Sequence, residues 1–406
     1  MNTLRSKKIS AALIIFIVIT GMVFSHPLYF MQSFLTAEEN QLSASTVNNV
    51  ETPSNISQVS SQYNDNFWHR SDLIWNNGLI AYTLNIKGYY SDSGVLVYDG
   101  NYIVSTSAKT STDYEVNQMK SLEDFLSDRG IKLMYVNAPT KYLDDTIIIN
   151  TFGIDSYTNR NADVFVQRMR DETNIPVIDL RDNIRAENKN IYTMFYRTDH
   201  HWTVPSGLWA SRIVAKSMNE HLGFNIDLSA LTDENFSFTH YEKAWVGEQG
   251  SKISEGYIGR DDFVCIEPIN TNMSFSITNL ENNNTVEGGF ELLCNKSRYE
   301  TEGLSWHYSY MPNGINASKI INHNVAEGKI LLLCDSFSYV IVPFLSQVVH
   351  EITTIIPRNY NGDILSLIDA NQYDSVIILY APFMIGAHDN PKSANYKMFS
   401  FNQAIE

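Results

Sequence analysis

The fold of this chain of 406 residues is decided by residues 329–338, which read KILLLCDSFS. The apolar run lies between Gly328 and Asp335 and predicts a strand buried on both faces, as is usual in parallel sheets. In open α/β sheets ligands bind beyond the carboxyl ends of the strands, and a helix that begins there directs its N-terminal amides at an anion. Asp335 and then Ser336 follow at the carboxyl end of this strand, so we predict that Ser336 is a nucleophile.

A second polar cluster lies upstream in residues 196–203, which read YRTDHHWT. In an extended segment residues two apart point to the same side, so Asp199 and His201 are expected to face one pocket and His200 to point away. In a hydrolase-type triad a carboxylate holds an imidazole, and the imidazole takes a proton from the nucleophile. We predict that Asp199, His201 and Ser336 form such a triad, with a purely structural hydrogen-bonded pair as the alternative.

Metal binding is a third interpretation of this cluster, with His200, His201 and one carboxylate as ligands. Adjacent histidines diverge in an extended segment, and no cysteine or histidine follows at a fixed offset. We therefore expect no metal and no cofactor. Asp335 comes one residue before the predicted nucleophile, and we expect it to cap the following helix rather than to serve as a second catalytic carboxylate.

Strand and helix patterns alternate around both clusters, which predicts an α/β fold with three layers, α/β/α. Thr203 as a cap and Pro205 in the first turn predict a helix directly after the histidines. The other predicted elements are a helix at 116–126 closed by Gly130, strands at 131–136, 175–180, 348–356 and 374–379, and helices at 163–172 and 363–369.

The region of about residues 225–325 breaks this alternation and is expected to be a strand-rich insertion or a lid. Packing in the core is the expected role of its aromatic and imidazole side chains, and stacking against sugars is the alternative. The residues concerned are Trp245, Trp306, His307 and Tyr308. Cys265 and Cys294 lie in the same region and could form a disulfide, whereas Cys334 is predicted to be a buried core residue.

The N-terminus predicts export, because basic residues precede an uncharged apolar run at 9–24. Apolar residues resume at 28–30 and bring the run near the roughly 20 residues of a spanning helix, so we favour an uncleaved anchor over a cleaved signal peptide. The predicted parts are a signal peptide or membrane anchor at 1–30, a polar flexible stalk at 31–65 and a catalytic domain at 66–406. This domain is expected on the extracytoplasmic face of the cell membrane, or secreted if the signal is cleaved.

Composition narrows the possible partners. The formal net charge of −16 argues against nucleic acid, since phosphate binding requires clustered lysine and arginine, and leaves neutral glycans as ligands. With 44% hydrophobic residues the chain can bury a large core.

Residues 199–202, Asp-His-His-Trp, resemble the signature of the DHHW proteins, relatives of the SGNH-like proteins that O-acetylate alginate and bacterial cellulose. The resemblance covers roughly residues 80–385. Three further segments carry it: a Pro-x-Lys turn at 138–141, a Gly-Asp-Ser-Tyr segment matched by 334–337, and a closing part at 356–358 followed by the strand 374–380. Cys334 stands where the family has glycine, and Phe337 where it has tyrosine.

The resemblance implies an SGNH-hydrolase-like sheet and an extracytoplasmic O-acetyltransferase that acts on hydroxyls of an exported cell-surface polysaccharide through Ser336, His201 and Asp199. A polysaccharide acetyl esterase and an inactive exopolysaccharide-binding scaffold are the alternatives. The expected partners are the polysaccharide acceptor and a membrane-bound O-acyltransferase that donates acetyl groups. Substrate-binding roles are expected for Arg358, Tyr380, Trp202 and Lys141.

Overall fold

The computed structural model describes residues 70–83, 95–98, 102–300, 305–386, 391 and 393–401. The chain divides between Ile74 and Trp75 into two units, and the fold described below belongs to the second, apart from residues 70–74 at the start of α3. The predicted anchor or signal peptide at 1–30 and the predicted stalk at 31–65 lie outside the described residues. Within the part of the chain that is described, no helix combines the length and the apolar character needed to cross a membrane.

An eight-stranded sheet forms the centre, in the order β4-β3-β12-β10-β11-β9-β7-β8. The first five strands in this order are parallel, and β9, β7 and β8 continue the sheet in antiparallel pairs. Its strands are β3 (Lys132–Asn137), β4 (Val177–Asp179), β7 (Phe275–Asn279), β8 (Asn284–Gly288), β9 (Ala317–Asn322), β10 (Lys329–Cys334), β11 (Glu351–Ile355) and β12 (Ser375–Tyr380). As predicted, β10 is central and its apolar residues are buried.

Among the described residues, two smaller pairs of strands lie outside this sheet: β1 (Val95–Tyr98) with β2 (Tyr102–Ser105), and β5 (Phe236–Trp245) with β6 (Asp261–Pro268). The α-helices are α3 (Arg70–Thr83), α4 (Asp113–Ser127), α5 (Thr146–Phe152), α6 (Thr158–Glu172), α7 (Leu180–Ala186), α8 (Ile191–Met194), α9 (Val204–Ser217), α10 (Glu248–Ser251), α11 (Glu255–Ile258), α12 (Val342–Leu345), α13 (Ile364–Asn371) and α14 (Ala394–Met398). Short 3-10 turns include η7 (Trp306–Ser309), η8 (Ser336–Val340), η9 (Pro357–Asn359) and η10 (Pro382–Met384).

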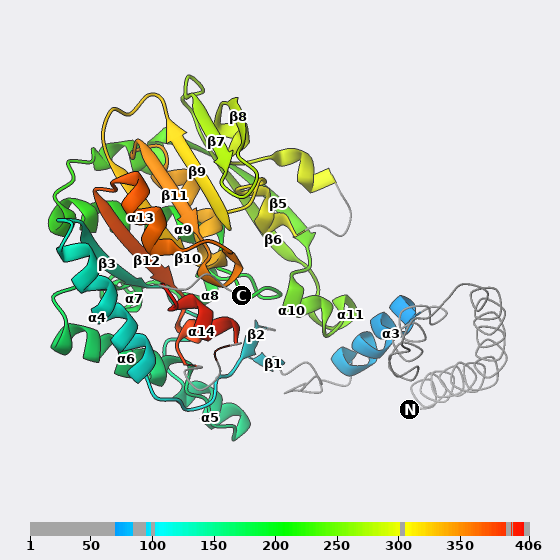
Figure 1. Ribbon diagram of the computed structural model, residues 1–406. Helices are drawn as coiled ribbons and strands as arrows, with labels where there is room; N and C mark the ends of the chain where they lie inside the picture. The colour runs from blue at the N-terminus through cyan, green and yellow to red at the C-terminus, as the bar shows by residue number, and fades with distance from the viewer. Residues whose placement is uncertain are drawn as a thin grey trace, which may run out of the picture. The chain divides into compact units, whose positions relative to one another are not determined.

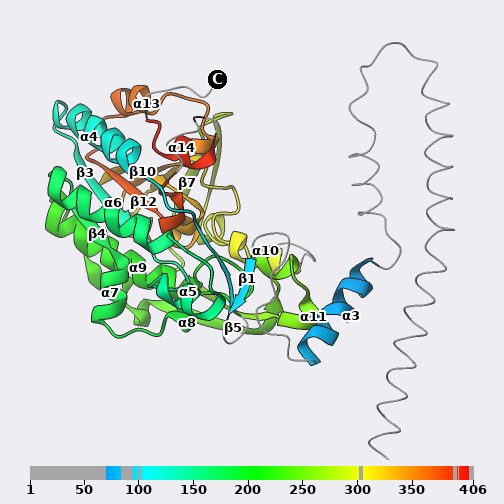
Figure 2. The ribbon, with the colours of Figure 1, turned by 90° about the horizontal axis from the view of Figure 1, so that it is seen from below.

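Helices cover both faces of the central sheet. Figures 1 and 2 show α4 and α13 over one face and α9 over the other. The predicted three-layer α/β fold is therefore confirmed. As predicted, Thr203 caps α9 by accepting a hydrogen bond from the amide of Ser206, and Pro205 lies in its first turn.

Some element boundaries differ from the prediction for local reasons. The strand predicted at 175–180 ends at Asp179, because the Asp179 carboxylate accepts a hydrogen bond from the Arg181 amide and thereby starts α7. The helix predicted at 163–172 begins earlier, at Thr158.

The region predicted as an insertion contributes β7, β8 and β9 to the edge of the central sheet. Two of its aromatic residues pack internally, because Trp245 is only 3% exposed and Trp306 stacks on Tyr299 with ring centroids 4.4 Å apart. The Cys265 and Cys294 thiols are buried and free, with their sulfur atoms 3.9 Å apart.

The parallel strands bring their carboxyl ends to one edge of the sheet. There β10 leads into Asp335, β3 leads into the turn at 138–141, and β11 leads into η9. Segments that lie far apart in the sequence therefore meet at the edge where ligands bind in open α/β sheets.

Candidate active site

Ser336 lies at the carboxyl end of β10 and is hydrogen-bonded to His201. The distance from Ser336 Oγ to His201 Nε2 is 2.8 Å, and His201 Nδ1 lies 2.6 Å from Asp199 Oδ1. Asp199 and His201 are buried, whereas Ser336 is half-buried. The structure thus brings together the three residues predicted as a triad, in the order carboxylate, imidazole, hydroxyl.

The surroundings of Asp199 keep it ionised. Burial by itself would raise the pKa of this carboxyl, but the adjoining His201 imidazole and its hydrogen bond hold the pKa well below its usual range. The backbone amide of Glu248 donates a further hydrogen bond to Asp199 Oδ2, at 2.9 Å. A carboxylate only accepts hydrogen bonds, so His201 carries its proton on Nδ1 and presents a basic Nε2 to Ser336.

The histidine loop, residues 195–202, is not an extended strand, and the prediction that His200 points away from His201 is wrong. Phe195 and Trp202 pair in an isolated antiparallel bridge, so the residues between them form a tight loop. The rings of His200 and His201 lie 3.8 Å apart between centroids and are tilted by 37°. Burial, followed by the neighbouring His201, lowers the pKa of His200 to about 4, so this ring is neutral at neutral pH.

Asp261, at the start of β6, anchors the histidine loop. Its carboxylate accepts hydrogen bonds from the backbone amides of Arg197 (2.9 Å) and Thr198 (2.8 Å) and from the Thr198 hydroxyl (2.6 Å). On another side Gly247 packs against Asp199 so closely that a Cβ atom at Gly247 would lie 2.3 Å from Asp199 Cβ. The position of the Asp199 carboxylate is therefore set by segments that lie about 50 residues further along the chain.

Asp335 builds the turn that presents Ser336. Its Oδ1 accepts a hydrogen bond from the amide of Phe337 (2.9 Å), and its Oδ2 accepts one from the amide of Ala381 (2.7 Å). The predicted capping role of Asp335 is confirmed. The element that follows is only the short turn η8. The backbone amide of Ser338 donates a further hydrogen bond to the backbone carbonyl oxygen of Asp335. The Phe337 and Ser338 amides are therefore already occupied, and the predicted use of helix amides for an oxyanion does not hold for them.

Trp202 and Tyr380 are fully buried, so the structure does not support their predicted contact with substrate. Trp202 Nε1 donates a hydrogen bond to the Phe337 carbonyl (2.9 Å), and the Tyr380 hydroxyl donates one to the Met398 carbonyl (2.7 Å). Both polar groups are satisfied within the protein. Trp202 braces the turn after Ser336 instead of facing a ligand.

Arg358 in η9 remains half-buried at the same edge of the sheet. Its Nη1 lies 3.4 Å from the sulfur of Met384. Burial raises the pKa of Asp335, and the positive charge of Arg358 opposes this rise. The guanidinium thus acts electrostatically on the turn that presents Ser336.

Lys141, another predicted substrate contact, is a buried clamp. Its Nζ donates hydrogen bonds to the carbonyl oxygens of Ile103 (2.6 Å) and Arg197 (3.0 Å) and to Oε1 of Gln249 (2.9 Å). Three acceptors match the three N–H groups of an ammonium ion. Burial lowers the pKa of Lys141 to about 7, with Asp199 the main opposing charge. Lys141 thus ties β2, the histidine loop and α10 together.

His307 in η7 belongs to the site although no motif marked it in the sequence. It is fully buried, and its ring stacks on His201 with centroids 3.9 Å apart and planes 15° from parallel. Its Nε2 lies 3.4 Å from the Ser336 carbonyl oxygen. Burial, followed by His201, holds the pKa of His307 well below its usual range, so the ring is neutral. The aromatic neighbours Trp306 and Tyr308 were the only signal at this position.

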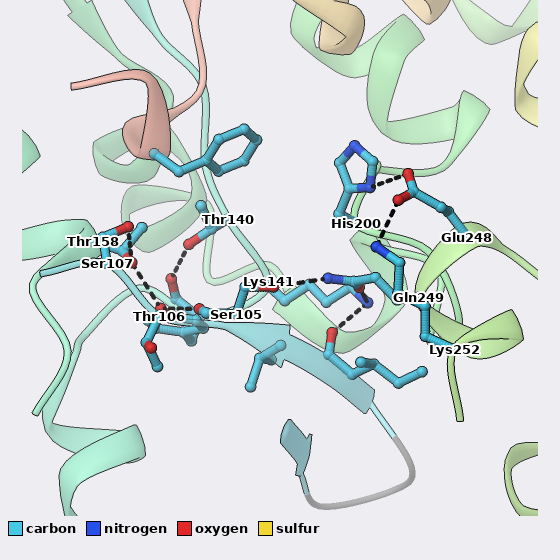
Figure 3. Close-up of a pocket in the computed structure, with 14 residues that line it drawn as sticks. Ser105, Thr106, Ser107, Thr140, Lys141, Thr158, His200, Glu248, Gln249 and Lys252 are labelled. Carbon is cyan, nitrogen blue, oxygen red and sulfur yellow. Dashed lines mark hydrogen bonds and ion pairs between the residues drawn. The ribbon is translucent and has the colours of Figure 1, made fainter. Parts of the chain in front are cut away.

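A cavity of about 280 Å³ opens beside the histidine loop. His200, Lys141 and Phe383 contribute to its lining, and Figure 3 shows His200 and Lys141 there. Because the His200 ring packs against the His201 ring, this cavity lies one imidazole away from the predicted catalytic base.

Asp199, His200 and His201 also place three ligand atoms within 4.8 Å of one another, close enough to share a metal ion. Hydrogen bonds already engage Asp199 Oδ1 and both ring nitrogens of His201. A shared ion would have to break the contact of His201 with Ser336 or with Asp199, so these donors fit a proton-transfer chain better than a metal site.

This architecture resembles that of SGNH hydrolase-like domains. Residues 96–243, which include Asp199 and His201, match the family model described as SGNH hydrolase-like domain, acetyltransferase AlgX. No curated protein sequence matches the chain.

Two solved structures share the fold. Bacillus cereus PatB1, solved with a sulfonyl adduct, aligns over 76% of this chain and 98% of its own, with a TM-score of 0.59 and 17% identity. A DHHW family protein from Eubacterium siraeum aligns over 79% of this chain and 99% of its own, with a TM-score of 0.59 and 16% identity. The resemblance to the DHHW and SGNH-like proteins is thus confirmed.

Proposed function

We propose that this chain is an extracytoplasmic O-acetyltransferase that acetylates hydroxyl groups of a cell-surface polysaccharide. The observation that carries the proposal is the hydrogen-bonded series from Asp199 through His201 to Ser336 at the carboxyl edge of the sheet. The match of residues 96–243 to an acetyltransferase family supports acetyl as the transferred group.

The first half-reaction would load the acetyl group onto Ser336. His201 Nε2 takes the hydroxyl proton while Ser336 Oγ attacks the acetyl carbonyl carbon, and Asp199 stabilises the imidazolium that forms. The bond to the donor's leaving group then breaks, and the leaving group takes the proton from His201. We propose Arg358 as a contact for the oxyanion or the substrate, because the Phe337 and Ser338 amides are occupied.

The second half-reaction would pass the acetyl group to a sugar. A sugar hydroxyl gives its proton to His201 Nε2, its oxygen attacks the acetyl carbon, and Ser336 leaves and recovers the proton. The stacked His307 ring covers one face of His201 and would keep its orientation through both steps.

The location and the partners of this reaction belong to the same proposal. An N-terminal anchor at 1–30 and a stalk at 31–65 would hold the domain near a membrane-bound O-acyltransferase that supplies acetyl groups. Tethering raises the effective concentration of an enzyme near its donor. The acceptor would be a polysaccharide leaving the cell.

An acetyl esterase is the second candidate, because water could replace the sugar in the second half-reaction. Mass spectrometry of an oligosaccharide incubated with enzyme and an acetyl donor separates the two. A mass gain of one acetyl group supports transfer. Loss of acetyl from an acetylated oligosaccharide, with no gain on any acceptor, supports the esterase.

Single substitutions test the three residues that carry the proposal. Ser336→Ala, His201→Ala and Asp199→Ala are each expected to lower turnover of an acetyl-ester reporter by about 10³-fold or more, since members of a triad act as a unit. Ser346→Ala, which changes a buried serine outside the site, is the control and should leave turnover unchanged. Substantial activity in a folded Ser336→Ala variant would refute the assignment of the nucleophile.

A further inference from the structure

The cavity beside the histidine loop has two chemically different sides (Figure 3). His200, Glu248 and Lys252 lie on one side, and Lys141 and Gln249 lie between the sides. The other side carries hydroxyl groups, contributed by Ser105, Thr106, Ser107, Thr140 and Thr158.

The charged groups of this cavity are balanced within the protein. Lys252 Nζ lies 2.7 Å from Glu248 Oε1, so these two form an ion pair. Lys141 donates its three protons to protein oxygens, and His200 is neutral. The lining therefore presents no free cation to an anionic ligand, and it suits a neutral one.

An aromatic ring completes the lining. Phe383 is half-buried, and its ring centroid lies 6.3 Å from that of His200 and 5.7 Å from that of Phe337. Pockets for small ligands combine apolar or aromatic walls with a few polar groups that fix orientation. A sugar ring has the matching chemistry, with C–H groups on its faces and hydroxyl groups around its rim.

The cavity is also close to the reacting groups. His200 packs against His201, and Phe337 directly follows Ser336. A ligand held in this cavity thus lies one imidazole, that of His200, away from the base that would take a proton from the acceptor.

We propose that this cavity binds one neutral sugar unit of the acceptor polysaccharide. The inference rests on the proposed function and names the acceptor subsite of the same site. A volume of about 280 Å³ is just below the roughly 300–1,000 Å³ typical of ligand pockets, which suits a single unit with the rest of the polymer outside.

Direct binding tests the subsite without requiring turnover. The Ser336→Ala protein is titrated calorimetrically with cellotetraose and its N-acetylglucosamine counterpart as neutral probes, and with tetramannuronate as an anionic probe. At least one neutral probe is expected to bind about tenfold or more tightly than the anionic one. Equal or tighter binding of tetramannuronate, or binding of no neutral probe, overturns the proposal.

Filling the cavity locates the binding. Thr106→Trp, added to the Ser336→Ala protein, is expected to weaken binding of the neutral probe about tenfold or more. Thr239→Trp, at an exposed position of β5 outside the cavity, should leave this affinity unchanged. Unchanged affinity in a folded Thr106→Trp protein places the sugar elsewhere and refutes the subsite. If Thr106→Trp does not fold, Phe383→Ala replaces it, with the same expected loss and the same refuting result.

The proposed function has a separate readout. Intact-protein mass spectrometry with an acetyl-ester donor detects acetyl on Ser336 as a mass gain in the wild-type chain that Ser336→Ala lacks, whatever binds in the cavity. Acetylation without sugar binding would refute the subsite alone, and sugar binding without acetylation would refute the acetyltransferase alone.

Discussion

Replacing Gly247 by alanine would test whether catalysis depends on the exact position of the Asp199 carboxylate. The backbone at Gly247 has φ −74°, which alanine adopts freely, so the substitution acts through space. The new Cβ would lie 2.3 Å from Asp199 Cβ and 2.7 Å from Asp199 Oδ2. Carbon atoms in contact prefer about 3.5–4.0 Å, so one of the two segments must move by about 1 Å or more.

Neither segment can move without changing the site. The amide of Gly247 donates to the Thr198 hydroxyl (2.7 Å), and the amide of Glu248 donates to Asp199 Oδ2 (2.9 Å). A misplacement of about 1 Å in a catalytic constellation costs about 100-fold in rate, which corresponds to about 2.7 kcal/mol of transition-state stabilisation. Overpacking costs about 1–3 kcal/mol of stability, so we expect the variant to fold.

The assay is kcat/KM for an acetyl-ester reporter, with urea unfolding of the same protein. We expect kcat/KM to fall about 100-fold, mostly in kcat. Gly289→Ala is the matched control, because its Cβ would meet only the flexible side chain of Glu291. A folded Gly247→Ala enzyme that keeps wild-type kcat/KM would show that Asp199 need not hold its position, and the reasoning about the triad would be wrong.

The other predictions concern Lys141, His200 and the thiol pair. Lys141→Met removes three hydrogen bonds and should lower kcat about tenfold or more in steady-state kinetics. The pKa of Lys141 is about 7 in the folded protein and 10.5, its ordinary value, in the unfolded chain, so between these pH values the unfolded chain binds the additional proton. The free energy of unfolding of the wild type should therefore rise from pH 7 to pH 10.5. Urea unfolding should show a smaller rise for Lys141→Met. His200→Ala should be much milder in kcat than His201→Ala, because it is His201 that is hydrogen-bonded to the Ser336 hydroxyl. The pKa of His200 is about 4 in the folded protein and 6.5 in the unfolded chain, so its contribution to the free energy of unfolding should fall by up to about 3 kcal/mol as the pH drops from 6.5 to 4. The free energy of unfolding of His200→Ala should therefore decrease less over this pH range. Diamide should oxidise Cys265 and Cys294 to a disulfide that closes a 29-residue loop. This disulfide should raise the free energy of unfolding of the domain by about 3.5 kcal/mol. An unchanged number of free thiols after diamide treatment would exclude the pairing.

The sequence predicted the elements with strong local signals. A run of buried aliphatic residues before Asp335 predicted β10 and placed Ser336 at its carboxyl end. The density of polar groups around Asp199 and His201 marked the other half of the site. Both signals are local, because they depend on burial of one strand and on one short motif.

Features that depend on tertiary contacts were not predictable in this way. His200 lies against His201 because the loop is held by Asp261 from β6, which overrides the alternation of an extended segment. Tyr380 lies at the end of β12, where a contact with substrate was expected. Its hydroxyl instead donates a hydrogen bond to the carbonyl oxygen of Met398, in the C-terminal part of the chain. His307 reaches His201 through the fold of η7, and nothing in its own sequence context specifies that contact.

The three proposed catalytic residues by themselves do not decide between transfer and hydrolysis, since both reactions would pass through acetyl-Ser336. Transfer requires the sugar to compete with water, and orientation supplies that advantage: well-placed groups reach effective molarities of about 10⁵ M or more. In this structure the candidate for such orientation is the cavity lined by His200 and Phe383, which lies one imidazole away from the base. His307 meanwhile covers one face of His201. Blocking the cavity should therefore shift the acetyl-enzyme from transfer toward hydrolysis, whereas loss of Ser336 should abolish both reactions. The ratio of acetylated sugar to free acetate thus reports on the cavity, and the sum of these two products reports on the nucleophile.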